Sequence, residues 1–163
     1  MEKQLIIIRR WLIFFMITLF LSGLTAIPVE SGLSFLCRVF PLHTAIGDWL
    51  DKVYAGVHAT NRQYPFLIYG YDWLAFAHFV LAILFVGPYQ DPVRNKWVFE
   101  FGMIVCILII PYAFIAGAAR GIPFWWRLID CSFGIGGLLP LGNCLIRIHR
   151  LEKLTEQTAA HEN

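Results

Sequence analysis

The sequence predicts an all-α fold: an integral membrane four-helix bundle with an amphipathic connector helix between helices one and two. Hydrophobic residues make up 58% of the 163 residues and charged residues only 15%, whereas a soluble domain carries about 25% charged residues. The mean hydropathy is +0.64, and the apolar residues gather in long runs, as in membrane spans. The runs place four spans, at about 11–29, 70–88, 97–119 and 124–146. We expect one domain over 1–150 and a polar C-terminal tail over 151–163.

The first run, residues 11–29, contains no charged residue. At about 1.5 Å per residue it covers about 28 Å, close to a hydrocarbon core of about 30 Å. Basic residues precede it, so a secretory signal peptide is the alternative. The run is long for the apolar part of such a peptide, and Leu24, Thr25 and Ala26 make a poor cleavage site. We therefore expect an uncleaved helix.

Aromatic residues mark the borders of the other three runs. Trp73, Trp97 and Trp125 lie at run ends, where amphipathic rings prefer the headgroup level of the membrane. Pro111 and Pro140 fall inside the third and fourth runs. Proline in a membrane helix usually produces a kink, and two kinked helices can separate enough to leave a cavity.

A long connector, residues 30–72, joins the first two spans. Thr44 is a residue type that caps helices, and apolar residues such as Trp49 and Val53 then recur at helical spacing. Charged residues fall on the other face. This pattern predicts an amphipathic helix over about 44–60 that lies on the outer membrane surface or over the mouth of the bundle. An ordinary connector helix is the alternative.

The distribution of Lys and Arg predicts the orientation. With the N-terminus inside, eight basic residues lie inside and five lie outside. The inside set is Lys3, Arg9, Arg10, Arg94, Lys96, Arg147, Arg150 and Lys153, and the outside set is Arg38, Lys52, Arg62, Arg120 and Arg127. We expect both termini in the cytoplasm and the chain in a bacterial inner (plasma) membrane. The net charge is only +2 and no basic stripe is present, so we expect no nucleic-acid partner.

Ionisable residues inside membrane spans are costly and are therefore candidates for function. His78 lies about 8 Å inside the second span, on a face that it shares with Ala75. Asp130 lies about two turns inside the fourth span, on a face with Gly134 and Gly137. We expect both ionisable side chains to point inward and to line one pocket. A hydrogen-bonded structural imidazole and a paired structural carboxylate are the alternatives.

No sequence motif for catalysis is present. The four cysteines show no CxxC spacing, and no nucleotide-binding, nucleophile or zinc-protease signature occurs. Catalytic residues are therefore unknown at this stage, and the sequence predicts neither a metal ion nor a cofactor. A haem held by His58 and His78, both on the outer side, is the alternative.

A series of residues spread over most of the chain occurs in an order that is similar to that of a known protein family. The residues are Glu30, Trp49, Tyr54, Ala55, Arg62, Tyr64, Asp72, Gly87, Pro88, Pro123, Trp125, Leu138, Leu139 and Pro140. In this order they resemble the emopamil-binding protein and sigma-2 receptor family, the EXPERA domain. The resemblance implies four or five membrane helices around a cavity for sterols or other amphiphiles, and some members are sterol isomerases.

The resemblance adds Glu30, Asp72 and Trp49 to His78 and Asp130 as candidate ligand-binding residues. The chain also departs from the family. His78 or its neighbours stand where the family has an acidic residue in helix two. Phe133 and Gly136 stand at about the positions of an Asn and a Trp that face the ligand in the isomerases. These departures argue against isomerase activity.

Together these patterns favour a membrane protein that binds a membrane lipid or another apolar small molecule in an intramembrane cavity, rather than an enzyme. Kinked helices, small-residue faces and an aromatic content of 16% support this interpretation. Two alternatives stay open. One is an accessory or structural subunit of a larger complex, with a membrane protein partner. The other is a sterol-isomerase-like or redox membrane enzyme.

Overall fold

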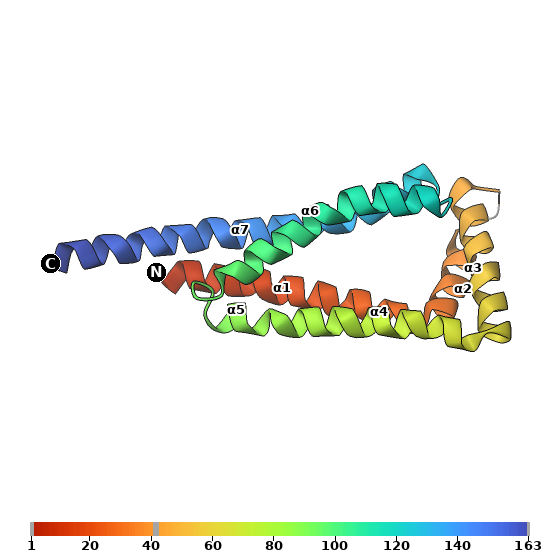
Figure 1. Cartoon of the computed structure of the whole chain (residues 1–163), viewed down its shortest axis with the longest axis horizontal. Coiled ribbons are helices and arrows are strands. Elements are labelled where there is room, and N and C mark those ends of the chain that lie inside the picture. Colours follow the sequence, from red (N-terminus) through yellow and green to blue (C-terminus); the bar gives the residue numbers. More distant parts are fainter. Residues whose placement is uncertain (1, 41–42, 163) are drawn as a thin grey trace. The chain divides into compact units, whose positions relative to one another are not determined.

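The structure is a computed structural model that describes residues 2–40 and 43–162. Within these ranges the chain forms seven helices and no strand (Figure 1). The helices are α1 (Glu2–Ala26), α2 (Val29–Val39), α3 (Ala45–Gln63), α4 (Pro65–Leu84), α5 (Val86–Gln90), α6 (Lys96–Ala119) and α7 (Phe124–Glu162). The all-α class expected from the sequence is confirmed.

Four helical stretches are long and apolar enough to cross a membrane. They are α1, α4 continued by α5, α6, and α7 as far as Thr155, with mean hydropathies between 1.4 and 2.4. Large apolar side chains on these helices are exposed: Ile83 by 68%, Ile115 by 72% and Phe133 by 64%. Such surface is unfavourable in water, whereas in a bilayer it is ordinary contact with hydrocarbon. The chain is therefore a multi-pass membrane protein.

The observed spans differ from the expected ones mainly at their ends. The second span begins at Pro65 rather than near residue 70, because proline suits the first helical position, where its missing N–H is not needed. α1 begins at Glu2 rather than at residue 11. α7 has 39 residues, about 58 Å of helix, and includes residues 151–162 of the expected tail. Residue 163 lies outside the described residues.

The described residues form two compact units. One contains the chain up to Ile17 and from Ile83 onward, and the other is Thr18–Ala82. The first unit therefore holds the beginning of α1 with α5, α6 and α7. The second holds the end of α1 with α2, α3 and nearly all of α4.

In the first unit, α6 and α7 form an antiparallel hairpin that is tightest at two glycines. A Cβ added to Gly134 would lie 2.5 Å from the carbonyl oxygen of Cys106, and one added to Gly137 would lie 2.6 Å from the sulfur of Cys106. Small residues allow helix backbones to approach this closely. Ile8 and Leu12 of α1 are completely buried in the same unit.

Polar contacts join three helices at one end of the first unit. Arg147 on α7 donates from Nη1 to the side-chain oxygen of Gln4 on α1, at 2.6 Å. Lys96, the first residue of α6, forms a 2.9 Å ion pair with Glu152 on α7. The beginning of α1, the beginning of α6 and the 147–152 part of α7 therefore lie at the same end of this unit.

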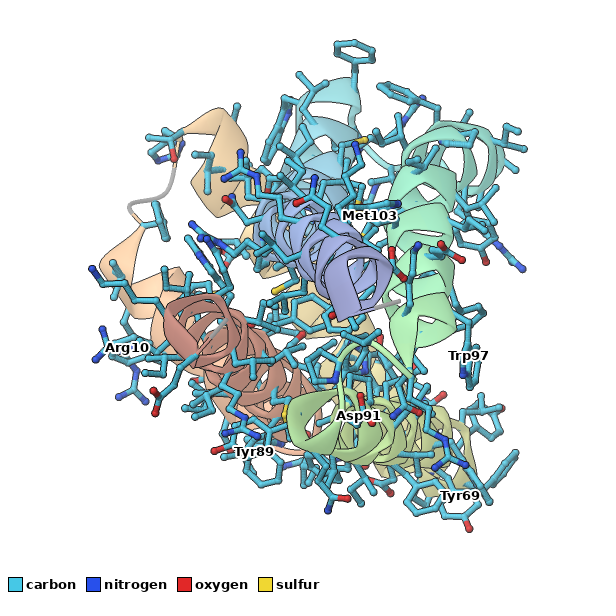
Figure 2. All side chains as sticks on the ribbon, turned by 90° about the vertical axis from the view of Figure 1, so that its left-hand side faces the viewer. Arg10, Tyr69, Tyr89, Asp91, Trp97 and Met103 are labelled. Carbon is cyan, nitrogen blue, oxygen red and sulfur yellow. The ribbon has the colours of Figure 1, made fainter. Side chains whose placement is uncertain are left out.

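The end of α5 reaches the same part of α1. The Nε of Arg9 donates to the carbonyl oxygen of Tyr89 at 3.2 Å, and the guanidinium lies 5.6 Å from the centre of the Tyr89 ring. Figure 2 views this end and shows Tyr89 beside α1, whereas Arg10 and Trp97 point away from their helices. Exposed Arg10 and Trp97 are typical of a membrane border.

In the second unit, α1 and α4 meet at a small-residue seam. A Cβ added to Gly23 of α1 would lie 2.8 Å from the Cβ of His78 and 2.9 Å from the carbonyl oxygen of Ala75. Ala75 is 1% exposed and Ala82 is 7% exposed. The small-residue face expected on the second span is therefore packed against another helix.

α2 and α3 lie side by side and run across the end of α1 and the beginning of α4 (Figure 1). Thr44 caps α3, because its hydroxyl accepts the N–H of Gly47 at 3.0 Å. The expected connector helix is thus confirmed, with the observed bounds Ala45–Gln63. α2 was not expected. It begins directly after Pro28, whereas the sequence analysis proposed no element between the first span and Thr44.

Candidate functional site

A groove of about 640 Å³ lies in the second unit, at the end of the first span. The end of α1, α2, α3 and the beginning of α4 all contribute to it. Its lining residues are Ile27, Pro28, Val29, Glu30, Ser31, Ser34, Phe35, Arg38, Tyr54, Asn61 and Ile68. The groove therefore combines polar side chains with apolar side chains from the ends of two membrane helices.

Glu30 is held by two donors from the neighbouring helix. His58 Nδ1 lies 2.5 Å from Glu30 Oε1, and Asn61 Nδ2 lies 2.6 Å from Oε2. An ionised carboxylate can only accept hydrogen bonds, so Nδ1 of His58 donates and carries a proton. Glu30 is in the first turn of α2, where a negative charge is favourable. His58 and Asn61 are three residues apart on α3 and therefore share a face.

These contacts lower the pKa of Glu30 below its ordinary value. The hydrogen bond from His58 has the largest effect, followed by the hydrogen bond from Asn61, and the nearby charges of His58 and Arg62 act in the same direction. Hydrogen bonds to the charged form of an acid always stabilise that form. Glu30 is therefore ionised at neutral pH and presents a fixed negative charge to the groove.

A positive charge lines the same groove at the other end of α2. Arg38 lies in the last turn of α2 and is exposed. Among the described residues its side chain makes no hydrogen bond and no ion pair. Ser31 and Ser34 lie between the two charges along α2, and Tyr54 adds a ring stacked on His58 with centres 5.7 Å apart. The groove thus offers an anion, a cation and hydroxyl groups.

Most of these groove residues were missed by the sequence analysis. It named Glu30, considered His58 only as a haem ligand and Arg38 only for the orientation of the chain, and did not propose Asn61 as a site residue. A signal existed, because Tyr54, His58 and Asn61 recur at helical spacing and form one polar face of α3. That this face meets Glu30 depends on α2, which had not been predicted.

Asp72 and Trp49 lie away from the groove. Asp72 is exposed on α4 beside a shallow depression of about 270 Å³, which it lines with Tyr69, Trp73 and Phe76. Trp49 is half-buried on α3, and the ammonium of Lys52 lies 5.9 Å from the centre of its ring. A ligand-binding role for either residue stays a prediction.

His78 is half-buried at the seam between α4 and α1. Its Nδ1 lies 2.8 Å from the carbonyl oxygen of Leu74 on the same helix. Because a carbonyl oxygen only accepts, Nδ1 donates this bond. The bond and the close approach of Gly23 favour a structural role for the imidazole.

Asp130 is half-buried on α7, four residues before the tight approach at Gly134. Arg127 directs its Nε to the carbonyl oxygen of Ile122 at 2.8 Å. Within the described residues no ion pair to Asp130 is formed. His78 and Asp130 belong to different units, and the pocket that they were expected to share stays a prediction.

The site is built from two helices that cross the membrane border and two that connect them. Its chemistry is that of a fixed carboxylate and a guanidinium that has no partner among the described residues, both in one groove. Comparison with protein-family models, with curated proteins and with solved structures finds no match for this chain.

Proposed function

We propose that this multi-pass membrane protein binds an amphiphilic small molecule, such as a membrane lipid, by its polar head. The observation that carries the proposal is the groove of about 640 Å³ at the end of the first span, with the carboxylate of Glu30 fixed in it. Binding sites for small molecules typically measure about 300–1,000 Å³ and combine apolar walls with a few oriented polar groups.

The lining of the groove suits a molecule with a polar end and an apolar end. Glu30, Arg38 and Asn61 supply the polar contacts. Ile27 follows directly after α1, and Ile68 lies in the first turn of α4, so both lie where membrane-spanning helices end. A bound head in the groove would leave its apolar tail next to these residues and to the surrounding lipid.

This proposal places the ligand at the membrane border rather than deep between the spans. It agrees with the implication of the EXPERA resemblance that the protein holds amphiphiles and that Glu30 takes part. It includes no isomerase step, because the residues that depart from that family argue against one.

We further propose that the groove faces away from the cytoplasm of a bacterial cell. In the first unit, the contacts of Arg147 and Lys96 join parts of α1, α6 and α7 that carry basic residues predicted to lie inside. α2 and α3 connect the first two spans in the sequence, so a first span that crosses the membrane would place them on the side opposite the N-terminus. The positive-inside rule then orients both termini toward the cytoplasm.

Mass spectrometry of the gently purified protein tests the proposal. The protein is extracted in mild detergent, and lipids that remain bound are identified and quantified. Ser34→Trp would fill the groove, and we expect it to reduce the retained lipid about tenfold, which corresponds to about 1.4 kcal/mol. Ser132→Trp introduces the same side chain at an exposed position of α7 and is expected to retain the lipid.

Two outcomes would contradict the proposal. In the first, the wild-type protein retains no lipid after gentle purification. In the second, Ser34→Trp retains as much lipid as the wild type. A stable large protein partner instead of a lipid would favour the accessory-subunit alternative.

A further inference from the structure

We infer that the groove recognises a zwitterionic headgroup in which a phosphate is joined to a primary amine, as in phosphatidylethanolamine. This inference rests on the proposed function, because it specifies the ligand of the same groove. It follows from the two opposite charges that line the groove and from the unused hydrogen-bonding capacity of each.

Arg38 fits the phosphate. Its guanidinium presents a planar set of N–H donors that matches two phosphate oxygens at once. Within the described part of the chain, Arg38 has no hydrogen-bond or ion-pair partner. A phosphate in the groove would therefore gain a charged partner without displacing one.

Glu30 fits the amine. Its two oxygens each accept one hydrogen bond from the protein, and an ionised carboxylate has about four lone-pair sites. Two acceptor positions are thus available to a ligand. The side chain is 30% exposed, so these positions can be reached from the groove. An ammonium group has three N–H donors and carries the complementary charge.

The spacing of the two charges suits a short zwitterion. Glu30 and Arg38 are eight residues apart on α2, which is about 12 Å along the helix axis. The long Arg38 side chain can cover part of this distance, and a phosphate joined to an amine by two carbons covers the remainder. Ser31 and Ser34 lie between the charges and line the groove, where their hydroxyls can bond the ester oxygens of the head.

Other headgroups leave one charge of the groove poorly matched. A phosphoglycerol head pairs with Arg38 but offers Glu30 only neutral hydroxyls, and charge-assisted hydrogen bonds are roughly twice as strong as neutral ones. A phosphocholine head carries a positive charge but has no N–H donor for Glu30. We therefore expect phosphatidylethanolamine to bind more tightly than lipids of either other class.

The test compares three lipids with identical short tails, bound to the purified full chain in detergent and quantified by native mass spectrometry. The lipids carry phosphoethanolamine, phosphoglycerol or phosphocholine heads. We expect the first to bind about tenfold more tightly than the other two, a difference of about 1.4 kcal/mol. Glycerophosphoethanolamine without tails is the fourth ligand. Weaker binding of this free headgroup identifies a membrane lipid as the source, and equal binding identifies a soluble zwitterion of the same chemistry.

Two substitutions test which charge of the groove binds which part of the headgroup. Glu30→Gln is expected to abolish the preference for phosphoethanolamine while phosphoglycerol binding persists. Arg38→Gln is expected to weaken the binding of all three lipids about tenfold. Within the described residues it removes no hydrogen bond and no ion pair. The matched controls Glu100→Gln and Arg120→Gln alter exposed residues of α6 and of the turn after it, and they should bind like the wild type.

The measurements distinguish a failure of the headgroup inference from a failure of the proposed function. Equal binding of the three lipids by the wild type, with Ser34→Trp still impaired, contradicts this inference and leaves the proposed function in place. Binding that is unaffected by both Arg38→Gln and Ser34→Trp contradicts both. Because Glu30→Gln is expected to be less stable near neutral pH, its binding is measured on protein that circular dichroism shows to be folded, and a preference for phosphoethanolamine that persists there contradicts the inference. If this variant does not fold, the comparison of the three lipids on the wild type decides.

Discussion

The side chain of Glu30 links α2 to residues of α3 that are far from it in the sequence. Its partners His58 and Asn61 lie 28 and 31 residues later in the chain. Both donors come from one face of α3, so a single carboxylate fixes the rotation of α3 relative to α2. A buried or half-buried acid is stable when its oxygens accept such bonds. The groove therefore depends on this residue for its shape as well as for its charge.

The stability of the α2–α3 contact should depend on pH through Glu30. The folded protein lowers the pKa of this carboxyl below its ordinary value of 4.5. The stabilisation is therefore complete above that value and is lost as the pH falls through the lower folded-state pKa. We expect thermal unfolding of wild type and Glu30→Gln to differ most near neutral pH and to converge as the medium is acidified below pH 4.5.

The control for this measurement is Glu100→Gln, which changes an exposed carboxyl on α6. It should follow the wild-type curve over the whole pH range. A difference in unfolding temperature between wild type and Glu30→Gln that stays constant at every pH would show that the ionised carboxylate does not stabilise the α2–α3 contact.

Among the elements, α6 and α7 owe their close packing to glycine. At Gly134 there is no space for a further carbon atom, because it would overlap the carbonyl of Cys106. Gly136, two residues later, has nothing within 4 Å of the same added atom. The two positions are on opposite faces of one helix, so the same substitution at each can be compared directly.

Gly134→Ala should therefore destabilise the hairpin and Gly136→Ala should not. Forcing an extra carbon into a closely packed interface costs about 1–3 kcal/mol. The free energy of unfolding in mixed detergent micelles, followed by circular dichroism, measures both variants. Equal stability of the two variants would mean that α6 and α7 do not approach at Gly134.

At the scale of the whole molecule, the proposed topology of four spans would place both chain ends on one side of the membrane. The predicted inside residues Lys3, Lys96 and Arg147 all belong to the first unit, in which contacts join the corresponding helix ends. Arg38, Lys52 and Arg62 of the predicted outside set belong to the second unit. Arg120 and Arg127, the other two residues of the outside set, belong to the first unit, near the end of α6 and the beginning of α7. This charge distribution supports the proposed orientation.

Reporter fusions test this orientation. Fusions at the N-terminus, within 91–95 and after residue 155 should all report the cytoplasm, and an insertion at His43 should report the opposite side. The reason is that translocation of short basic segments is unfavourable. A reporter after residue 155 that lies on the same side as His43 would contradict the four-span topology.

The sequence alone determined the class of the protein and the position of its membrane spans. A span needs about 20 apolar residues in succession, and such a run is a local property that can be read directly. The cap at Thr44 and the amphipathic face of α3 are local in the same sense, since each depends on residues within a few positions. The ends of the helices were less predictable. Proline can mark either the end of one helix or the beginning of the next, and Pro65 lies two residues after the end of α3 and is the first residue of α4.

Only the tertiary structure decided which polar residues share a site. His78 and Asp130 are candidates by sequence because an ionisable group is costly in hydrocarbon, yet one ring nitrogen of His78 is hydrogen-bonded within its own helix. The groove instead joins Glu30 to His58 and Asn61. That arrangement requires α2, a helix of 11 residues that is too short to be stable by itself in water. Its formation depends on packing against α3, and contacts between residues about 30 positions apart are not a property of any local stretch of sequence.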